Sequence, residues 1–438
     1  MTQVVVVGGG LAGVASAVRL AKLGHQVTLV ERREQVGGAI GFVEQDGFRW
    51  DAGPHATALP AVLRDLFRKS GRPLEKELDL VPVEPMREHR FADGARLVLP
   101  SGSRAAQLEA VDAALGAGAG RQWVDHVHAQ GEAWDRLRRD WLERPWSPGT
   151  APRETEALLR TRRTLHRATQ KRFKDERLRI LARHHAVQGG HDPRNVPEWF
   201  GLVDYLEQNF GTWTVPGGMG LLAGLLAKRL ADRRVTVMTG TTATDVEMGT
   251  DGPVAVLTDS GRVEADRVVV AVDPRRLPVL ARHVRRTMPA IPPAVTHLGL
   301  SGDVPDLPHE TVIHDEYTLT VRKDGSGPDG GVAWTVVGRG RVAEDLLVAL
   351  ARKRLDVRDA VVTRVDRSPL HIVEEYGGSP AGVLWQGRAT LDQRLSTRTP
   401  LPGVYAAGAN VGGGGWLPFV GLSAAQVAEE IGPADRSR

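Results

Sequence analysis

A glycine-rich turn near the N-terminus constrains this chain more than any other feature. Residues 3–7 are valine-rich and predict a short buried parallel strand, and Gly8, Gly10 and Gly13 follow in the G-x-G-x-x-G spacing. An apolar-periodic stretch then predicts a helix, and residues 27–30 predict a second strand. A strand, a glycine turn and a helix in this order are typical of a dinucleotide-binding Rossmann fold.

Each glycine has its own task in such a turn. Gly8 permits the tight turn from strand to helix, Gly10 lets the backbone approach a pyrophosphate, and Gly13 lets helix and strand pack closely. The helix N-terminus presents free N–H groups and a positive dipole end to the phosphates. Glu31 ends the second strand, where its carboxylate can accept hydrogen bonds from the ribose hydroxyls of adenosine.

The residues after Glu31 favour FAD over NAD. Gly37-Gly38 follows the acid by six residues, which resembles the extended fingerprint of glutathione-reductase-type FAD proteins. Ala39 stands where many such proteins have an arginine. Residues 51–54 (Asp-Ala-Gly-Pro) and His55 resemble the loop that reaches the flavin ring in this superfamily. We therefore expect FAD as the cofactor.

A second glycine-rich segment lies near the other end of the chain. Residues 404–407 predict a strand, residues 408–410 (Gly-Ala-Asn) and four consecutive glycines at 412–415 follow, and a helix is predicted to start at Pro418. Four glycines are costly to order, so a flavin ring or its ribityl chain is expected to approach this backbone. A helix N-terminus there would stabilise negative charge on the reduced ring.

The rest of the chain shows two kinds of pattern. Residues 104–146 and 153–185 predict helices, whereas residues 295–300, 311–322 and 332–337 alternate like strands of an antiparallel sheet. We expect an α/β fold in which a Rossmann-type, glutathione-reductase-like FAD-binding domain is interleaved with an α+β substrate domain of antiparallel sheet and helices. The predicted FAD-binding segments are residues 1–70, 215–290 and 385–438, and the substrate segments are a helical cap at 71–214 and residues 291–384.

Composition excludes several classes of function. The chain has no cysteine, which removes disulfides, thiolate catalysis, thiolate metal sites and a cysteine-linked flavin, and no metal site is expected. A net charge of +4 does not indicate a nucleic-acid partner. The sequence has no run of about 18 apolar residues and no signal-peptide pattern. We therefore expect a cytoplasmic protein.

Two stretches of the predicted cap allow more than one interpretation. Residues 153–185 are rich in arginine and lysine; a solvated face is favoured, and peripheral contact with an anionic membrane remains open. No base-reading motif supports nucleic-acid binding there. Core packing is favoured over a substrate pocket for a cluster of tryptophans, namely Trp123, Trp134, Trp141 and Trp146. The oligomeric state is not indicated.

Taken together, these segments resemble the phytoene desaturase-like branch of the FAD-dependent amine oxidase superfamily. The resemblance implies non-covalent FAD and dehydrogenation of an apolar small molecule, such as an isoprenoid or secondary metabolite. Electrons would pass from FAD to oxygen, a quinone or another carrier, since no second nucleotide fingerprint indicates an NAD(P)H site. The segments that carry the resemblance are residues 8–13, Glu31 with Gly37-Gly38, and residues 51–54, 216–219, 270–274 and 408–423.

The motifs and the resemblance give one set of expected cofactor-binding residues and no catalytic base. Three alternative functions remain open: a flavin-dependent amine or porphyrinogen oxidase, a flavin-assisted isomerase without net oxidation, and a flavin-binding protein without catalysis. The expected cofactor-binding residues are Gly8, Gly10, Leu11, Ala12, Gly13, Glu31, Arg32, Gly37, Gly38, Ala39, Gly53, Pro54, His55, Ala243, Gly408, Ala409, Asn410, Leu417, Phe419 and Val420.

Overall fold

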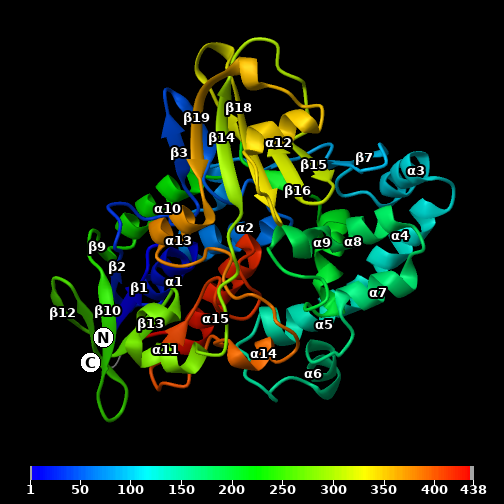
Figure 1. The fold of residues 1–438 in the computed structure, drawn as a ribbon. Coiled ribbons are helices and arrows are strands. Elements are labelled where there is room, and N and C mark those ends of the chain that lie inside the picture. The colour runs from blue at the N-terminus through cyan, green and yellow to red at the C-terminus, as the bar shows by residue number, and fades with distance from the viewer. Residues whose placement is uncertain (1, 435–438) are drawn as a thin grey trace.

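A parallel sheet of five strands forms one half of the molecule (Figure 1). The structure is a computed structural model that describes residues 2–434, so residues 1 and 435–438 of the predicted FAD-binding segments lie outside it. The strands, in spatial order, are β20 (Val404–Ala406), β13 (Arg267–Val270), β1 (Gln3–Val7), β2 (Gln26–Val30) and β9 (Thr236–Met238). Strands from the start, middle and end of the chain are therefore neighbours.

The valine run of β1 is apolar throughout because both faces of the sheet are covered. Val4 and Val6 pack against helices, whereas Val5 and Val7 pack toward the opposite face. In Figure 1 the last helix lies beside the first, and the two are in contact. The helices on the first face are α1 (Leu11–Lys22), α2 (Pro60–Ser70), α10 (Leu221–Asp232) and α15 (Leu417–Ile431).

The opposite face is covered by a small antiparallel sheet and a short helix. These elements are β10 (Ala243–Met248), β11 (Pro253–Thr258), β12 (Gly261–Glu264) and α11 (Pro278–Val284). In this sheet β11 is the central strand and pairs with β10 on one side and β12 on the other.

A sheet of seven strands forms the second half of the molecule. It confirms the predicted antiparallel sheet, but residues 311–322 form a hairpin instead of one strand. Strands β6 and β7 come from the stretch predicted as a helical cap, and β6 pairs in parallel with β15, a long-range pairing that no local pattern signals. The order is β19 (Val361–Arg367), β14 (Ala294–Leu300), β18 (Val332–Arg339), β16 (Thr318–Arg322), β15 (Glu310–His314), β6 (Arg87–Arg90) and β7 (Arg96–Leu99).

Helices pack beside this sheet and complete the second half (Figure 1). The four clustered tryptophans are all at most 6% exposed, and three of them share one apolar core, which confirms the packing interpretation. The helices are α3 (Arg104–Leu115), α4 (Ala119–His128), α5 (Gln130–Leu137), α6 (Arg153–Leu159), α7 (Leu165–Arg172), α8 (Glu176–Gln188) and α9 (Leu202–Phe210).

The basic stretch at 153–185 spans three separate helices instead of one amphipathic helix. Several of its arginines pair with acids: Arg160 with Asp392, for example, and Arg179 with Glu176. Membrane contact through this stretch stays a prediction. Over residues 2–434, no helix has the length and apolarity needed to cross a bilayer.

Short elements connect the two halves. Strands β3 and β4 follow the nucleotide motif in sequence, yet β4 pairs with β17 from the second half. The segment boundaries given above remain a prediction. The connecting elements are β3 (Phe42–Gln45), β4 (Phe48–Asp51), β17 (Gly325–Ser326), β5 (Val81–Pro82), β8 (Trp213–Thr214), α13 (Pro369–Tyr376) and α14 (Thr390–Gln393). Helix α12 (Leu346–Arg352) joins β18 to β19 and packs on the seven-stranded sheet.

Candidate active site

A first cavity lies at the carboxyl edge of the parallel sheet, where α/β folds bind their ligands. Each of four strands ends beside it: β1 at Gly8, β2 at Glu31, β13 at Ala271 and β20 near Gly408. Most of the predicted cofactor residues line it, namely Gly8, Gly10, Leu11, Ala12, Glu31, Gly37, Gly38, Ala39, Pro54, Gly408, Ala409, Asn410, Leu417 and Val420.

The glycine turn has the shape that a bound pyrophosphate requires. Gly8 has a φ of +101°, which L-residues with side chains rarely adopt. A Cβ on Gly13 would lie 1.8 Å from the carbonyl oxygen of Gly8, so this glycine fixes the packing of α1 on the turn. A Cβ on Gly10 would meet no atom closer than 4.0 Å. It would occupy open space in the cavity, and no side chain caps α1 there. The cradle therefore fits a phosphate group.

Glu31 is held in place by the backbone of the turn. Its Oε2 accepts a hydrogen bond from the N–H of Gly9 at 2.6 Å, and its Oε1 accepts one from the N–H of Arg33 at 2.8 Å. The side chain is buried and lines the cavity. Each carboxylate oxygen can accept a further hydrogen bond, which suits a ribose hydroxyl.

Some predicted cofactor residues do not line this cavity. Gly13 lies beneath the turn, and Gly53 and His55 line a second cavity instead. A Cβ on Gly53 would lie 2.4 Å from the carbonyl oxygen of Ala39, so this glycine allows two loops to approach closely.

The sequence analysis assigned Arg32 to the cofactor, whereas its neighbour Arg33 is the arginine that lines the first cavity. Arg32 points away and donates to backbone carbonyl oxygens of α13. Ala243 begins β10 and does not line the cavity, and Phe419 packs in the tryptophan-rich core. Residues 32–36 are bends and not a strand, so no alternation pattern in the sequence distinguishes Arg33 from Arg32.

The sequence analysis also missed several residues of the first cavity. Asp273 follows β13, while Tyr376, Ser379 and Pro380 come from the segment at the end of α13. The segment has no nucleotide fingerprint, so nothing in its local pattern indicates its place beside the cavity.

Two sequence motifs that the prediction treated separately meet through Asp51. Its carboxylate accepts hydrogen bonds from the N–H groups of Met219 at 3.0 Å and Gly220 at 2.8 Å. Burial raises the pKa of Asp51 to about 6. The 216–219 motif thus anchors the loop that continues to Pro54 and His55.

The second cavity adjoins the first. Both are lined by Ala39, Pro54, Gly415 and Leu417, so a long ligand in the first would present one end to the second. Much of the wall is apolar, including Met86, Phe200, Val295, Val337, Ile372, Val383, Trp385 and Trp416.

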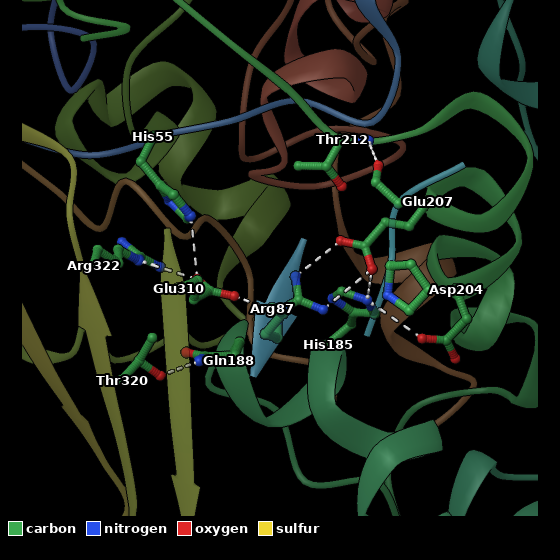
Figure 2. A network of polar contacts seen from close by, with 12 residues as sticks. His55, Arg87, His185, Gln188, Asp204, Glu207, Thr212, Glu310, Thr320 and Arg322 are labelled. Atoms are coloured by element: carbon green, nitrogen blue, oxygen red, sulfur yellow. Dashed lines mark hydrogen bonds and ion pairs between the residues drawn. The ribbon is translucent and has the colours of Figure 1, made fainter. Parts of the chain in front are cut away.

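A buried network of charges forms one side of the second cavity (Figure 2). Arg87 on β6 lies between Glu207 of α9, at 3.0 Å, and Glu310 of β15. Arg322 also pairs with Glu310, at 3.3 Å, and the Nε2 of His55 lies 3.1 Å from the same carboxylate.

A second branch of the network runs through His185 on α8 (Figure 2). Its Nε2 lies 3.0 Å from Glu207 and 3.3 Å from Asp204. Burial acts to lower the pKa of His185, but the two carboxylates outweigh it and raise that pKa to about 9. His185 is therefore an imidazolium at neutral pH, and Glu207 partners both this cation and Arg87.

His55 differs from His185 in charge state. Burial, with a smaller contribution from Arg322, lowers the pKa of His55 to about 3 in spite of Glu310. The ring is neutral at pH 7 and can donate a hydrogen bond from Nε2 to Glu310, which leaves Nδ1 as an acceptor. Sequence reasoning gave His55 no chemical role because its partner lies far away in the chain.

Comparisons with known proteins identify the family. Residues 11–431 match the model of the family described as flavin containing amine oxidoreductase. A phytoene dehydrogenase of Streptomyces griseus is 32% identical over 71% of this chain and 62% of that protein. A hydroxyneurosporene desaturase of Cereibacter sphaeroides is 29% identical over 98% of this chain and 97% of that protein. A neurosporene-forming phytoene desaturase of the same organism matches over only 44% of its length.

Solved structures share the fold at low sequence identity. Cyclohexylamine oxidase from Brevibacterium oxydans has a TM-score of 0.66 at 17% identity, over 98% of this chain and 99% of that chain. Putrescine oxidase with bound putrescine has a TM-score of 0.67 at 17% identity, over 98% of both chains. The matches confirm the predicted α/β FAD-binding fold with a second domain, and FAD as the cofactor. The chain belongs to the flavin-containing amine oxidoreductase family, in its phytoene desaturase-like branch.

Proposed function

We propose that this protein is an FAD-dependent oxidoreductase that dehydrogenates a largely apolar small molecule in the second cavity. The observation that carries the proposal is the junction of the two cavities at Ala39, Pro54, Gly415 and Leu417. A flavin whose adenosine and pyrophosphate occupy the first cavity would present its ring at this junction, where a substrate in the second cavity can meet it.

The residues of the first cavity would bind and orient the cofactor. The N-terminus of α1 would bind the pyrophosphate, Glu31 the ribose hydroxyls, and Arg33 would add positive charge beside them. Bound FAD supplies an acceptor for a hydride equivalent, and the protein supplies orientation and electrostatics. The N-terminus of α15, at Leu417, would favour negative charge at the junction.

The residues of the second cavity would hold and orient the substrate. Apolar side chains, among them Phe200 and Trp385, exclude water from an apolar body. His55 lines the cavity, but a pKa of about 3 makes it too weak a base to take a proton at neutral pH, so no catalytic base is assigned. Glu310 would fix the neutral ring through Nε2, which leaves Nδ1 as a hydrogen-bond acceptor.

An anaerobic reduction experiment tests this proposal. The FAD-loaded protein is mixed with isoprenoid and other apolar candidates, and the visible flavin absorbance is followed with product analysis. We expect bleaching coupled to a desaturated product, recovery when oxygen or a quinone is added, and slow bleaching by NADH or NADPH. Product that forms only as an isomer, with the flavin oxidation state unchanged, would contradict the proposal in favour of an isomerase. A flavin reduced by dithionite and by no substrate would indicate a non-catalytic flavoprotein.

A further inference from the structure

Two arginines that line the second cavity have no acidic partner among the side chains that the structure describes. Arg339 ends β18 and Arg394 follows α14. The other arginines of the wall, Arg87 and Arg322, each pair with a glutamate. Within residues 2–434, no carboxylate lies within 4.0 Å of either Arg339 or Arg394. The cavity therefore holds two positive charges that the described chain does not neutralise.

Arg394 is the more constrained of the two. Its side chain is buried, with 6% of the residue exposed, and its Nη2 donates to the carbonyl oxygen of Val411 at 3.0 Å. Its Nε and Nη1 are buried and have no hydrogen-bond partner among the described residues. Its guanidinium carbon lies 5.5 Å from the ring centre of Trp385. An unpaired buried donor costs about 1–3 kcal/mol, more when charged, so a partner from outside the chain is indicated.

Arg339 and His191 line the same cavity. Arg339 donates through Nη1 to the carbonyl oxygen of Ile291, and its Nε is also unpartnered. Burial and then the charges of Arg394 and Arg339 lower the pKa of His191 to about 4. A neutral His191 accepts the N–H of Trp385 at Nδ1, at 3.4 Å, so its Nε2 carries a proton.

We propose that Arg394 binds a carboxylate at one end of the substrate, and that Arg339 and His191 support it with positive charge and a hydrogen-bond donor in the same cavity. The inference rests on the proposed function, since it names the substrate class of that same cavity. A carboxylate matches the planar fork of an arginine and accepts several hydrogen bonds at once. The adjoining wall is apolar, with Phe200, Val337 and Val383 among its residues. The substrate is then an apolar acid, not a pure hydrocarbon.

The same residues discriminate against other substrate classes. A hydrocarbon would leave the N–H groups of Arg394 and Arg339 buried and unpaired. An ammonium group at this end of the cavity would be repelled by Arg394, which has no carboxylate within 4.0 Å among the described side chains. This argues against the amine oxidase alternative, although the fold is shared with amine oxidases.

A pair of matched ligands tests the subsite without turnover. Farnesoic acid and farnesol share one apolar skeleton and differ in the terminal group. Their binding to the FAD-loaded protein is measured by perturbation of the flavin spectrum and by quenching of tryptophan fluorescence, since Trp385 and Trp416 line the cavity. We expect the acid to bind at least about tenfold more tightly than the alcohol, which is a difference of about 1.4 kcal/mol in binding free energy.

Variants assign the preference to particular side chains. Arg394→Met should weaken binding of the acid about tenfold or more and leave the alcohol unchanged. Arg339→Met removes a charge without a direct contact, so it should weaken binding of the acid by a smaller factor, about threefold, and also leave the alcohol unchanged. Arg394→Lys should recover part of the loss. Arg388→Met is the matched control, because Arg388 is exposed, lies six residues before Arg394 and does not line the cavity. It should leave both affinities unchanged.

Several outcomes would overturn the subsite. Equal affinity for acid and alcohol would do so, as would failure of both to bind. Loss of FAD from Arg394→Met with an intact acid preference would show that this arginine serves the flavin. If Arg394→Met does not fold, the subsite is still tested by Arg339→Met and by the binding of the acid and the alcohol to the wild-type protein. Tight acid binding with a flavin that no substrate reduces would leave the subsite standing and contradict the proposed function alone.

Discussion

The two adjoining cavities are built in different ways. The first is made mainly of backbone and small side chains, from short motifs in which neighbouring residues act together. The second is made of large and charged side chains from strands and helices far apart in the sequence, as Arg87 on β6 and Glu310 on β15 illustrate. A backbone cradle suits the part of the ligand common to all dinucleotides, whereas a wall of side chains can change with the substrate.

The largest effect that would sharpen this comparison is expected at Gly10. In Gly10→Val a side chain would enter the space proposed for the pyrophosphate, and its Cβ would lie no closer than 4.0 Å to the surrounding chain. We expect the affinity for FAD to fall by about a thousandfold or more, which is about 4 kcal/mol. Flavin absorbance per protein, with circular dichroism for folding, measures this.

A matched control for this variant is Gly224→Val. Gly224 lies on α10, where an added Cβ also meets nothing within 4 Å, but it does not line the cavity. This protein should retain its flavin. Full FAD occupancy in Gly10→Val would show that the phosphates bind elsewhere.

The next largest effect is expected on the stability of the protein, at the buried charges of the second cavity. Arg87→Met removes the cation that lies between Glu207 and Glu310 and leaves two buried carboxylates short of a partner. We expect the free energy of unfolding to fall by about 3–5 kcal/mol. Arg64→Met breaks an exposed pair with Glu75 and should cost at most about 1 kcal/mol. Equal urea midpoints for the two variants would contradict a structural role for the buried network.

The stability of the protein should also depend on pH through His185 of the second cavity. The pKa of His185 is raised to about 9, so its contribution to stability is complete below the ordinary value near 6.5 and is lost as the pH rises through 9. The free energy of unfolding should fall by about 3 kcal/mol over this range. Urea titrations at about pH 6 and 9.5 measure it. His185→Gln should flatten the change, and a variant with the wild-type slope would refute the assignment.

The smallest effect compares two neighbouring arginines at the first cavity. Arg33 lines it and Arg32 does not. Arg33→Met should weaken FAD binding about fivefold, roughly 1 kcal/mol, since a partly exposed cation contributes modestly. Arg32→Met should leave FAD affinity unchanged in the same fluorescence titration. The reverse result would restore the prediction made from the sequence.

Sequence reasoning succeeded where structure is local. The strand, glycine turn and helix at residues 3–22 follow from spacing alone, and so does the strand before Gly408. It failed where position depends on long-range pairing. Nothing in residues 87–90 indicates a parallel partner at 311–313. Phe419 was assigned to the cofactor by its place in a motif, but on a helix it faces the tryptophan core.

The charged wall could not be predicted for a related reason. Arginine is usually exposed, and no local pattern separates the buried Arg394 from the exposed Arg388. Their difference arises only when the loop after α14 packs against residues 411–414, where Arg394 meets the Val411 carbonyl. Local sequence patterns therefore indicate the cofactor, whereas the residues that would bind the substrate become visible only in the folded structure.

The pairing of β20 with β13 and of α15 with α1 also has a consequence during protein synthesis. At about 5–20 residues per second, a ribosome needs roughly 20–80 s to reach Gly408 after completing Gly10. During this time the glycine turn exists without its C-terminal wall, and the apolar face of α1 lacks the helix that covers it. We therefore expect the chain to retain FAD only after most of it has been synthesised. A shortage of FAD in the cell would then leave nearly complete chains exposed to chaperones and proteases.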